Sequence, residues 1–172
     1  MQALSAVLGR AARHCVETGT NPDEYVTARL YPDMAPFHFQ IEALKNHAVW
    51  GVEAVRTGEF APPPLVGEVP FVELQQTIAE AIRALEALDP EQVDSCSGKS
   101  LDIVVYRPVD EENASTSAWG PRTFRFTPET FLLSYSLPNF YFHAVTAYNI
   151  LRTRGVPIGK GNYEGKLRGA NA

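Results

Sequence analysis

Apolar residues recur at steps of three and four in four stretches of this sequence, and that spacing is the strongest constraint on its fold. Residues 2–19 form one such stretch, and Gly19 ends it. Two further stretches cover 35–56 and a segment that begins at Thr127 and ends near 152–154. The clearest stretch is 71–88, where one helical face carries Leu74, Ile78, Ala81, Ile82, Leu85 and Leu88. We therefore expect a chain built mainly from four long helices.

The last of these helices has a strong start and a strong stop. Thr127 offers a capping side chain and is followed by a proline and an acidic residue, both favourable in a first turn. Gly155, with Pro157 just beyond it, ends the helix. Pro138 lies inside the pattern, so we expect a kink there that frees the carbonyl of Ser134.

A change of pattern separates the third helix from the fourth. Residues 101–106 are rich in β-branched side chains, and residues 123–126 alternate apolar and basic positions. A polar loop lies between the two segments. The simplest interpretation is a small β-hairpin inserted between the two helices, and the alternative is two separate strands. The Pro62–Pro64 run must be extended, because proline fixes φ and lacks an amide proton.

Length and charge limit the classes of function. The 172 residues predict a single domain over 1–165, followed by a glycine-rich flexible tail over 166–172. With 15 basic and 20 acidic side chains the net charge is −5, which disfavours nucleic acids and anionic membranes as partners. No apolar run suits a membrane span or an export signal. Cys15 and Cys96 form no CxxC motif, so we expect free thiols in the cytoplasm.

Histidines are the residues most able to carry chemistry, because no nucleophile–base or phosphate-loop motif is present. His38 and His47 lie nine residues apart on roughly opposite sides of one helix, so they cannot share an ion. Asn139 and His143 are four residues apart, and their side chains therefore meet on one helical face. His143 is interpreted either as a core histidine that fixes helix register or as a group that contacts a ligand or metal in a cleft.

Aromatic residues crowd the same helix. Such crowding is typical of a core or of a dimer interface, and it favours a homodimer. The residues concerned are Phe131, Tyr135, Phe140, Tyr141, Phe142 and Tyr148.

Several segments together resemble a domain-of-unknown-function family of the DinB/YfiT-like helical-bundle superfamily. They are Ala28–Met34, Gln40, Leu137–Tyr148 with its PNFYFH block, Ile150–Arg152, and the pairs Gly155-Val156 and Gly159-Lys160. The resemblance implies an all-α four-helix bundle that often forms a homodimer. It also implies a divalent metal such as zinc or nickel, held by one histidine on the second helix and an HxxxH pair on the fourth.

Carried over residue by residue, the HxxxH pair falls on Asn139 and His143, so asparagine replaces the first histidine. The ligand from the second helix corresponds to His47, although Gln40 is the residue that looks like the family's own. At most two of three nitrogen ligands remain, which favours a protein without a metal cofactor over one with zinc or nickel.

Three functions stay open. The first is binding of a small molecule in a bundle cleft lined by His143, Asn139, Gln40 and Tyr141, without demonstrated catalysis. The second is a metal-dependent hydrolase or thiol transferase that uses His47 and His143. The third is a structural or stress-related dimeric interaction protein whose aromatic helix is the interface.

Overall fold

The computed structural model describes residues 1–110, 112–113 and 117–166. This part of the chain is mostly helical, as predicted, with one small antiparallel sheet. Four helices have 16 residues or more, and they are α1 (Gln2–Thr18), α2 (Phe37–Thr57), α3 (Phe71–Glu86) and α6 (Leu137–Thr153).

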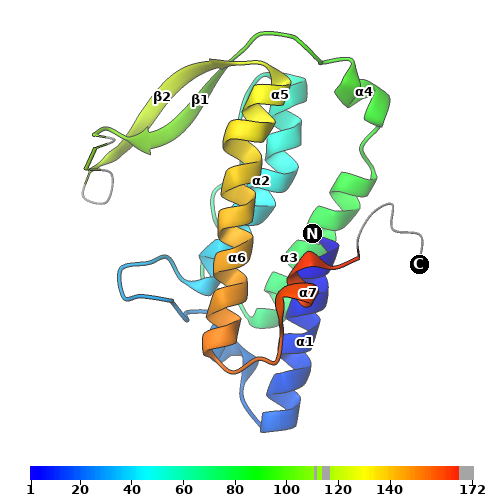
Figure 1. Cartoon of the computed structure of the whole chain (residues 1–172), viewed down its shortest axis with the longest axis vertical. Coiled ribbons are helices and arrows are strands. Elements are labelled where there is room, and N and C mark those ends of the chain that lie inside the picture. Colours follow the sequence, from blue (N-terminus) through cyan, green and yellow to red (C-terminus); the bar gives the residue numbers. More distant parts are fainter. Residues whose placement is uncertain (111, 114–116, 167–172) are drawn as a thin grey trace.

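The long helices pack along one another, with α2 beside α6 and α1 beside α3 (Figure 1). Because α2 and α3 run in the same direction, the connection over residues 58–70 has to return along the length of α2 (Figure 1). The short helix α7 (Lys160–Glu164) packs on α1. The returning connection matters for function, because it becomes one wall of the cavity described below.

Helix ends follow the sequence signals closely. Gly19 and Gly58 adopt left-handed φ angles of 69° and 83°, and they end α1 and α2. The 3₁₀ turn η1 (Pro22–Tyr25) is capped by Asn21, whose side chain accepts a hydrogen bond from the amide of Asp23. The start of α3 uses a distant partner, since the amide of Phe71 donates to Asp23 at 2.8 Å.

The segment leading into α6 differs from the single kinked helix that we expected. A four-residue helix α5 (Pro128–Phe131) is followed by the π-helical turn η2 (Leu132–Ser136), and α6 starts at Leu137. Pro138 therefore lies in the first turn of α6, where its missing amide proton costs little. The carbonyl that a side chain takes up is that of Tyr135, to which the side-chain amide of Asn139 donates, rather than that of Ser134.

The predicted β-hairpin is confirmed, and two separate strands are excluded. Strands β1 (Leu101–Pro108) and β2 (Trp119–Phe126) pair antiparallel between the short helix α4 (Pro90–Asp94) and α5. The hairpin projects from the upper end of the helices (Figure 1). The predicted flexible tail lies almost wholly outside the described residues.

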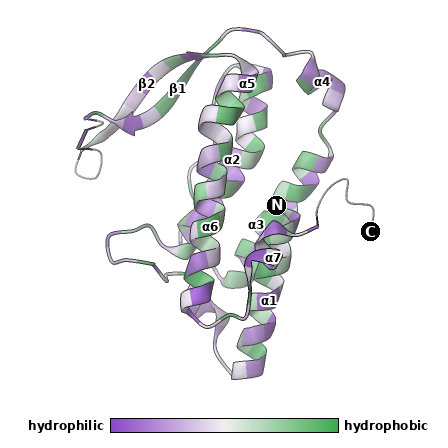
Figure 2. Ribbon diagram, viewed as in Figure 1, coloured by the Kyte–Doolittle hydropathy of each residue, from purple (hydrophilic) through white to green (hydrophobic). Residues whose placement is uncertain are grey.

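Apolar residues concentrate on the four long helices, whereas α4 and α7 are largely hydrophilic (Figure 2). The buried apolar residues form two cores. The larger core lies between α1, α2, α3 and the second half of α6, and the smaller one lies where the end of α2 meets β1 and Phe131. Between these two cores, the middle of α2 and the start of α6 face each other with the polar and aromatic side chains of Gln40, His47, Asn139 and His143. None of the described helices is long and apolar enough to cross a bilayer.

Candidate functional site

A cavity of about 700 Å³ opens between α2 and α6. The returning connection and the hairpin complete its walls. Among the described residues that line it, none is aspartate, glutamate, lysine or arginine. The cavity therefore combines aromatic walls with a few uncharged polar groups, which is the usual make-up of a small-molecule site.

One face of α2 supplies three of the lining residues. Gln40, Ala43 and His47 follow each other at steps of three and four, so helical geometry places them in one row. Asn46 lies beside this row and also lines the cavity. Gln40 and Asn46 are only 2% and 7% exposed, although both carry amides that need partners.

The facing row comes from η2 and α6. Tyr135, Asn139, Phe142 and His143 line the cavity from this side. Asn139 donates an amide proton to the carbonyl of Tyr135 at 2.7 Å, and this bond fixes the orientation of its side chain. The predicted meeting of Asn139 and His143 on one face is confirmed.

Gln40 joins the two rows and sets the tautomer of His143. Its Nε2 donates to the carbonyl of Ala35 at 3.0 Å, so its Oε1 points the other way and lies 2.8 Å from Nδ1 of His143. An amide oxygen can only accept, hence Nδ1 of His143 carries the proton. The Nε2 atom of His143 is then left with a lone pair that can accept a hydrogen bond.

His47 lies inside an aromatic stack. Its ring is nearly parallel to that of His143, at 5.9 Å and 13°, and to that of Phe60, at 5.3 Å and 18°. Tyr135 meets it edge-on at 5.4 Å. The pKa of both histidines is lowered to about 4, by burial in each case and, for His47, also by the neighbouring His143. Both rings are therefore neutral at pH 7.

Two buried polar atoms at this site have no hydrogen-bond partner among the described residues, namely Oδ1 of Asn46 and Nδ1 of His47. An unpaired buried polar atom costs about 1–3 kcal/mol. Both atoms belong to residues that line the same cavity, so a single bound molecule or water could satisfy them.

The outer wall is held in place by Glu42. This buried carboxylate accepts hydrogen bonds from the amides of Val66 and Gly67 at 2.5 and 3.1 Å, and so anchors the returning connection against α2. The anchored segment carries Phe60 and the proline run, which line the cavity. At the rim, Tyr106 and Trp119 of the hairpin are 62% and 61% exposed.

The structure thus brings together three of the four residues predicted to bind a ligand, and adds His47. Tyr141 lies elsewhere, because two residues after Asn139 a helix has turned by about 200°. It is 55% exposed and lines a separate cavity of about 350 Å³ with Met1, Tyr148 and other residues of α1, α6 and α7.

Sequence reasoning missed several members of the site. Asn46 and the row formed by Gln40 and His47 could have been found from the helical spacing of α2. No local signal pointed to Phe60 or Trp119, because their positions depend on how the connection and the hairpin fold back over the helices.

The donor set does not fit the three-nitrogen metal site that the resemblance implies. Among the described residues, no group of three histidine, cysteine, aspartate or glutamate side chains could hold an ion. His143 uses Nδ1 for Gln40 and keeps only Nε2, and Asn139 can offer only its amide oxygen, which is a weak ligand for zinc or nickel. What remains is a pair of stacked imidazoles, and transition-metal sites normally have at least three protein ligands.

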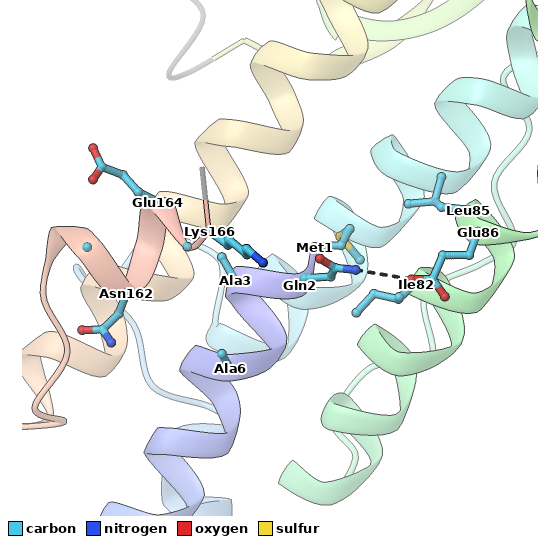
Figure 3. Close-up of a pocket in the computed structure, with 12 residues that line it drawn as sticks. Met1, Gln2, Ala3, Ala6, Ile82, Leu85, Glu86, Asn162, Glu164 and Lys166 are labelled. Atoms are coloured by element: carbon cyan, nitrogen blue, oxygen red, sulfur yellow. Dashed lines mark hydrogen bonds between the residues drawn. The ribbon is translucent and has the colours of Figure 1, made fainter. Parts of the chain in front are cut away.

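A second hollow, of about 690 Å³, lies where the start of α1 meets the end of α3 and α7 (Figure 3). Gln2 donates to Glu86 across it at 3.3 Å, as the dashed line in Figure 3 marks. Its charged side chains Glu86, Glu164 and Lys166 are exposed to solvent. Because its polar groups are already hydrated, this hollow offers less to a ligand than the cavity between α2 and α6.

The architecture is that of the DinB class of helical proteins. A crystal structure of a DinB family member from Shewanella denitrificans aligns with 99% of this chain and 88% of its own, with a TM-score of 0.73 and 23% sequence identity. At that identity the likeness concerns the fold. A family model described as "Domain of unknown function (DUF1993)" matches residues 1–164, and the chain therefore belongs to the DUF1993 family. The predicted family resemblance is confirmed, while comparison with curated proteins found no match.

Proposed function

We propose that this protein binds a small molecule in the cavity between α2 and α6. The helices α1, α2, α3 and α6 act, in this proposal, as a four-helix bundle that frames the cavity. The observation that carries the proposal is a pair of buried, unpartnered polar atoms that belong to Asn46 and His47, two residues that line an uncharged aromatic cavity.

The energetics favour an occupant. The two unpaired atoms together cost a few kcal/mol of folding free energy, which a ligand bonding both would recover. Gln40 is anchored at both ends of its amide, so the polar groups are already ordered before a ligand arrives. A preordered site loses less entropy on binding. The π turn beside the cavity agrees with this, because such turns are frequent at functional sites.

The test is a fragment screen by NMR on protein labelled at histidine and aromatic positions. We expect fragments that bind to shift the ring signals of His47 and His143. Ala43→Leu should abolish these shifts, because the added side chain fills the cavity. Ala84→Leu is the matched control, since it makes the same change at an exposed position of α3.

Folding of each variant is checked by circular dichroism. If Ala43→Leu fails to fold, Asn46→Leu is the second cavity variant, because it keeps the volume and removes the polar atoms. The proposal is refuted if no fragment shifts the two histidine signals, or if binding is the same in the filled cavity.

The metal-dependent hydrolase or thiol transferase is the alternative at the same site. It predicts stoichiometric zinc or nickel in untagged protein, measured by elemental analysis, and loss of that metal in His143→Gln. Metal bound at one equivalent with both histidines required would replace the small-molecule proposal.

A second function, self-association, is supported by the outer face of α6. Leu137, Tyr141 and Val145 are spaced by four residues and are 38%, 55% and 39% exposed, which makes an apolar stripe on one helix. We propose that this stripe pairs with a second copy of the chain, because twofold dimers are the commonest assembly.

Sedimentation velocity tests the dimer. We expect a dimer at micromolar concentration and a monomer for Val145→Glu, which places a charge in the centre of the stripe. Val72→Glu, on an exposed position of α3, is the matched control. A monomeric wild-type protein, or a dimer that survives Val145→Glu, contradicts this function.

A further inference from the structure

We propose that the occupant of the cavity is an uncharged, flat aromatic molecule that carries an N–H or O–H donor. This inference rests on the proposed small-molecule function and narrows it to one chemical class. Charge, hydrogen-bonding polarity and shape each support it, and they come from different residues of the site.

Charge is the first argument. The described residues that line the cavity include no aspartate, glutamate, lysine or arginine, and both histidines are neutral at pH 7 because burial lowers their pKa to about 4. An ionic ligand would leave water without gaining a counter-charge, which costs several kcal/mol. The cavity therefore selects against carboxylates, phosphates and amines.

Polarity is the second argument. Nε2 of His143 presents a lone pair, because Nδ1 donates to Gln40. Oδ1 of Asn46 is buried without a partner. The amide nitrogen of Asn139 is used by Tyr135, so the oxygen is the end of that side chain left to accept. The lone pair of His143 and the amide oxygens of Asn46 and Asn139 are the acceptors of the site, and they favour a ligand that brings a donor.

Shape is the third argument. His143, His47 and Phe60 form a stack of nearly parallel rings, with interplanar angles of 13° and 18°. Phe39 meets His143 edge-on at 5.8 Å, and Trp119 and Tyr106 stand at the rim. Flat rings gain most from stacked and edge-on contacts of this kind. A volume of about 700 Å³ leaves room for two fused rings.

Three probes with the same ring system separate these arguments. 2-Naphthol carries a donor, 2-methoxynaphthalene lacks one, and 2-naphthoate is an anion at pH 7. Binding to the full chain is measured by titration calorimetry, with the histidine NMR signals reporting the site. We expect 2-naphthol to bind at least tenfold more tightly than either of the other two.

Variants identify the acceptors. Asn46→Leu and His143→Phe each keep a similar volume and remove an acceptor, so each should reduce the preference for 2-naphthol while leaving 2-methoxynaphthalene within about twofold. Gln40→Leu acts through His143: without the amide oxygen the imidazole can take either tautomer. We expect this variant to weaken the binding of 2-naphthol more than it weakens the binding of 2-methoxynaphthalene. Ala84→Leu is again the control.

The outcomes distinguish the class from the function. The class is wrong if 2-naphthoate or 2-methoxynaphthalene binds as well as 2-naphthol, or if only fragments of another class shift the histidine signals, and in each case small-molecule binding itself stands. If neither these probes nor any fragment of the screen binds in the cavity, both the proposed ligand class and the proposed function are wrong.

Discussion

Mild acid should destabilise this protein through the two stacked histidines. In the folded state the pKa values of His47 and His143 are about 4, against an ordinary value of 6.5. Between these values the unfolded chain binds more protons than the folded chain, so stability falls as the pH falls. The loss begins below pH 6.5 and levels off below pH 4.

The size of the effect follows from the two pKa values. At pH 5 each imidazole taken alone costs about 2 kcal/mol relative to pH 7. The pair costs about 4 kcal/mol, a large share of the 5–15 kcal/mol that typically stabilises a domain. Hydrogen bonds from Ser97 and neighbouring groups lower the pKa of Glu129 to about 2. This carboxylate therefore changes the stability only below its ordinary pKa of 4.5. The window from pH 7 to pH 5 therefore reports the histidines.

The assay is urea unfolding at pH 7 and pH 5, followed by the fluorescence of Trp50 and Trp119. His47→Gln and His143→Gln should each halve the difference between the two pH values, because each removes one of the two titrating rings. Comparing each variant with itself at the two pH values cancels any constant loss of stability. An unchanged pH difference in both variants, or ring-proton NMR titrations with midpoints near 6.5, would refute the reasoning.

Three further predictions concern packing and anchoring. Gly51→Ala should cost about 1–3 kcal/mol in urea unfolding, because the new Cβ would lie 2.1 Å from Oγ of Ser136, and it should cost less in a Ser136→Ala background. An equal cost in both backgrounds would contradict this close approach. Glu42→Gln leaves one acceptor for two backbone amides, so it should lower the free energy of unfolding by about 1–2 kcal/mol and speed hydrogen exchange at Val66. Unchanged exchange would show that the carboxylate does not hold the cavity wall. Asp23→Ala removes the acceptor for the first amide of α3 and should cost about 1 kcal/mol, and a cost near zero would mean that water replaces it.

Sequence reasoning reached part of the candidate site because part of it is local. Asn139 and His143 share a face through helical spacing alone, whereas Gln40 is predicted through the family resemblance. Tyr141 is predicted to line the same cleft, but the helical turn between positions 139 and 141 places it in another cavity. Spacing along a helix therefore transfers to the structure, and the same spacing separates Tyr141 from Asn139.

What the sequence by itself determined is the set of elements. Periodicity, capping residues and glycine stops are local properties, so they predicted the long helices, the hairpin and most of their ends. Only the tertiary structure decided what these elements enclose. The stack of His47 on His143, the proline segment anchored by Glu42 and the hairpin rim join residues up to a hundred positions apart. Such contacts, and the pKa values that burial produces, arise from packing between helices and have no counterpart in any local pattern.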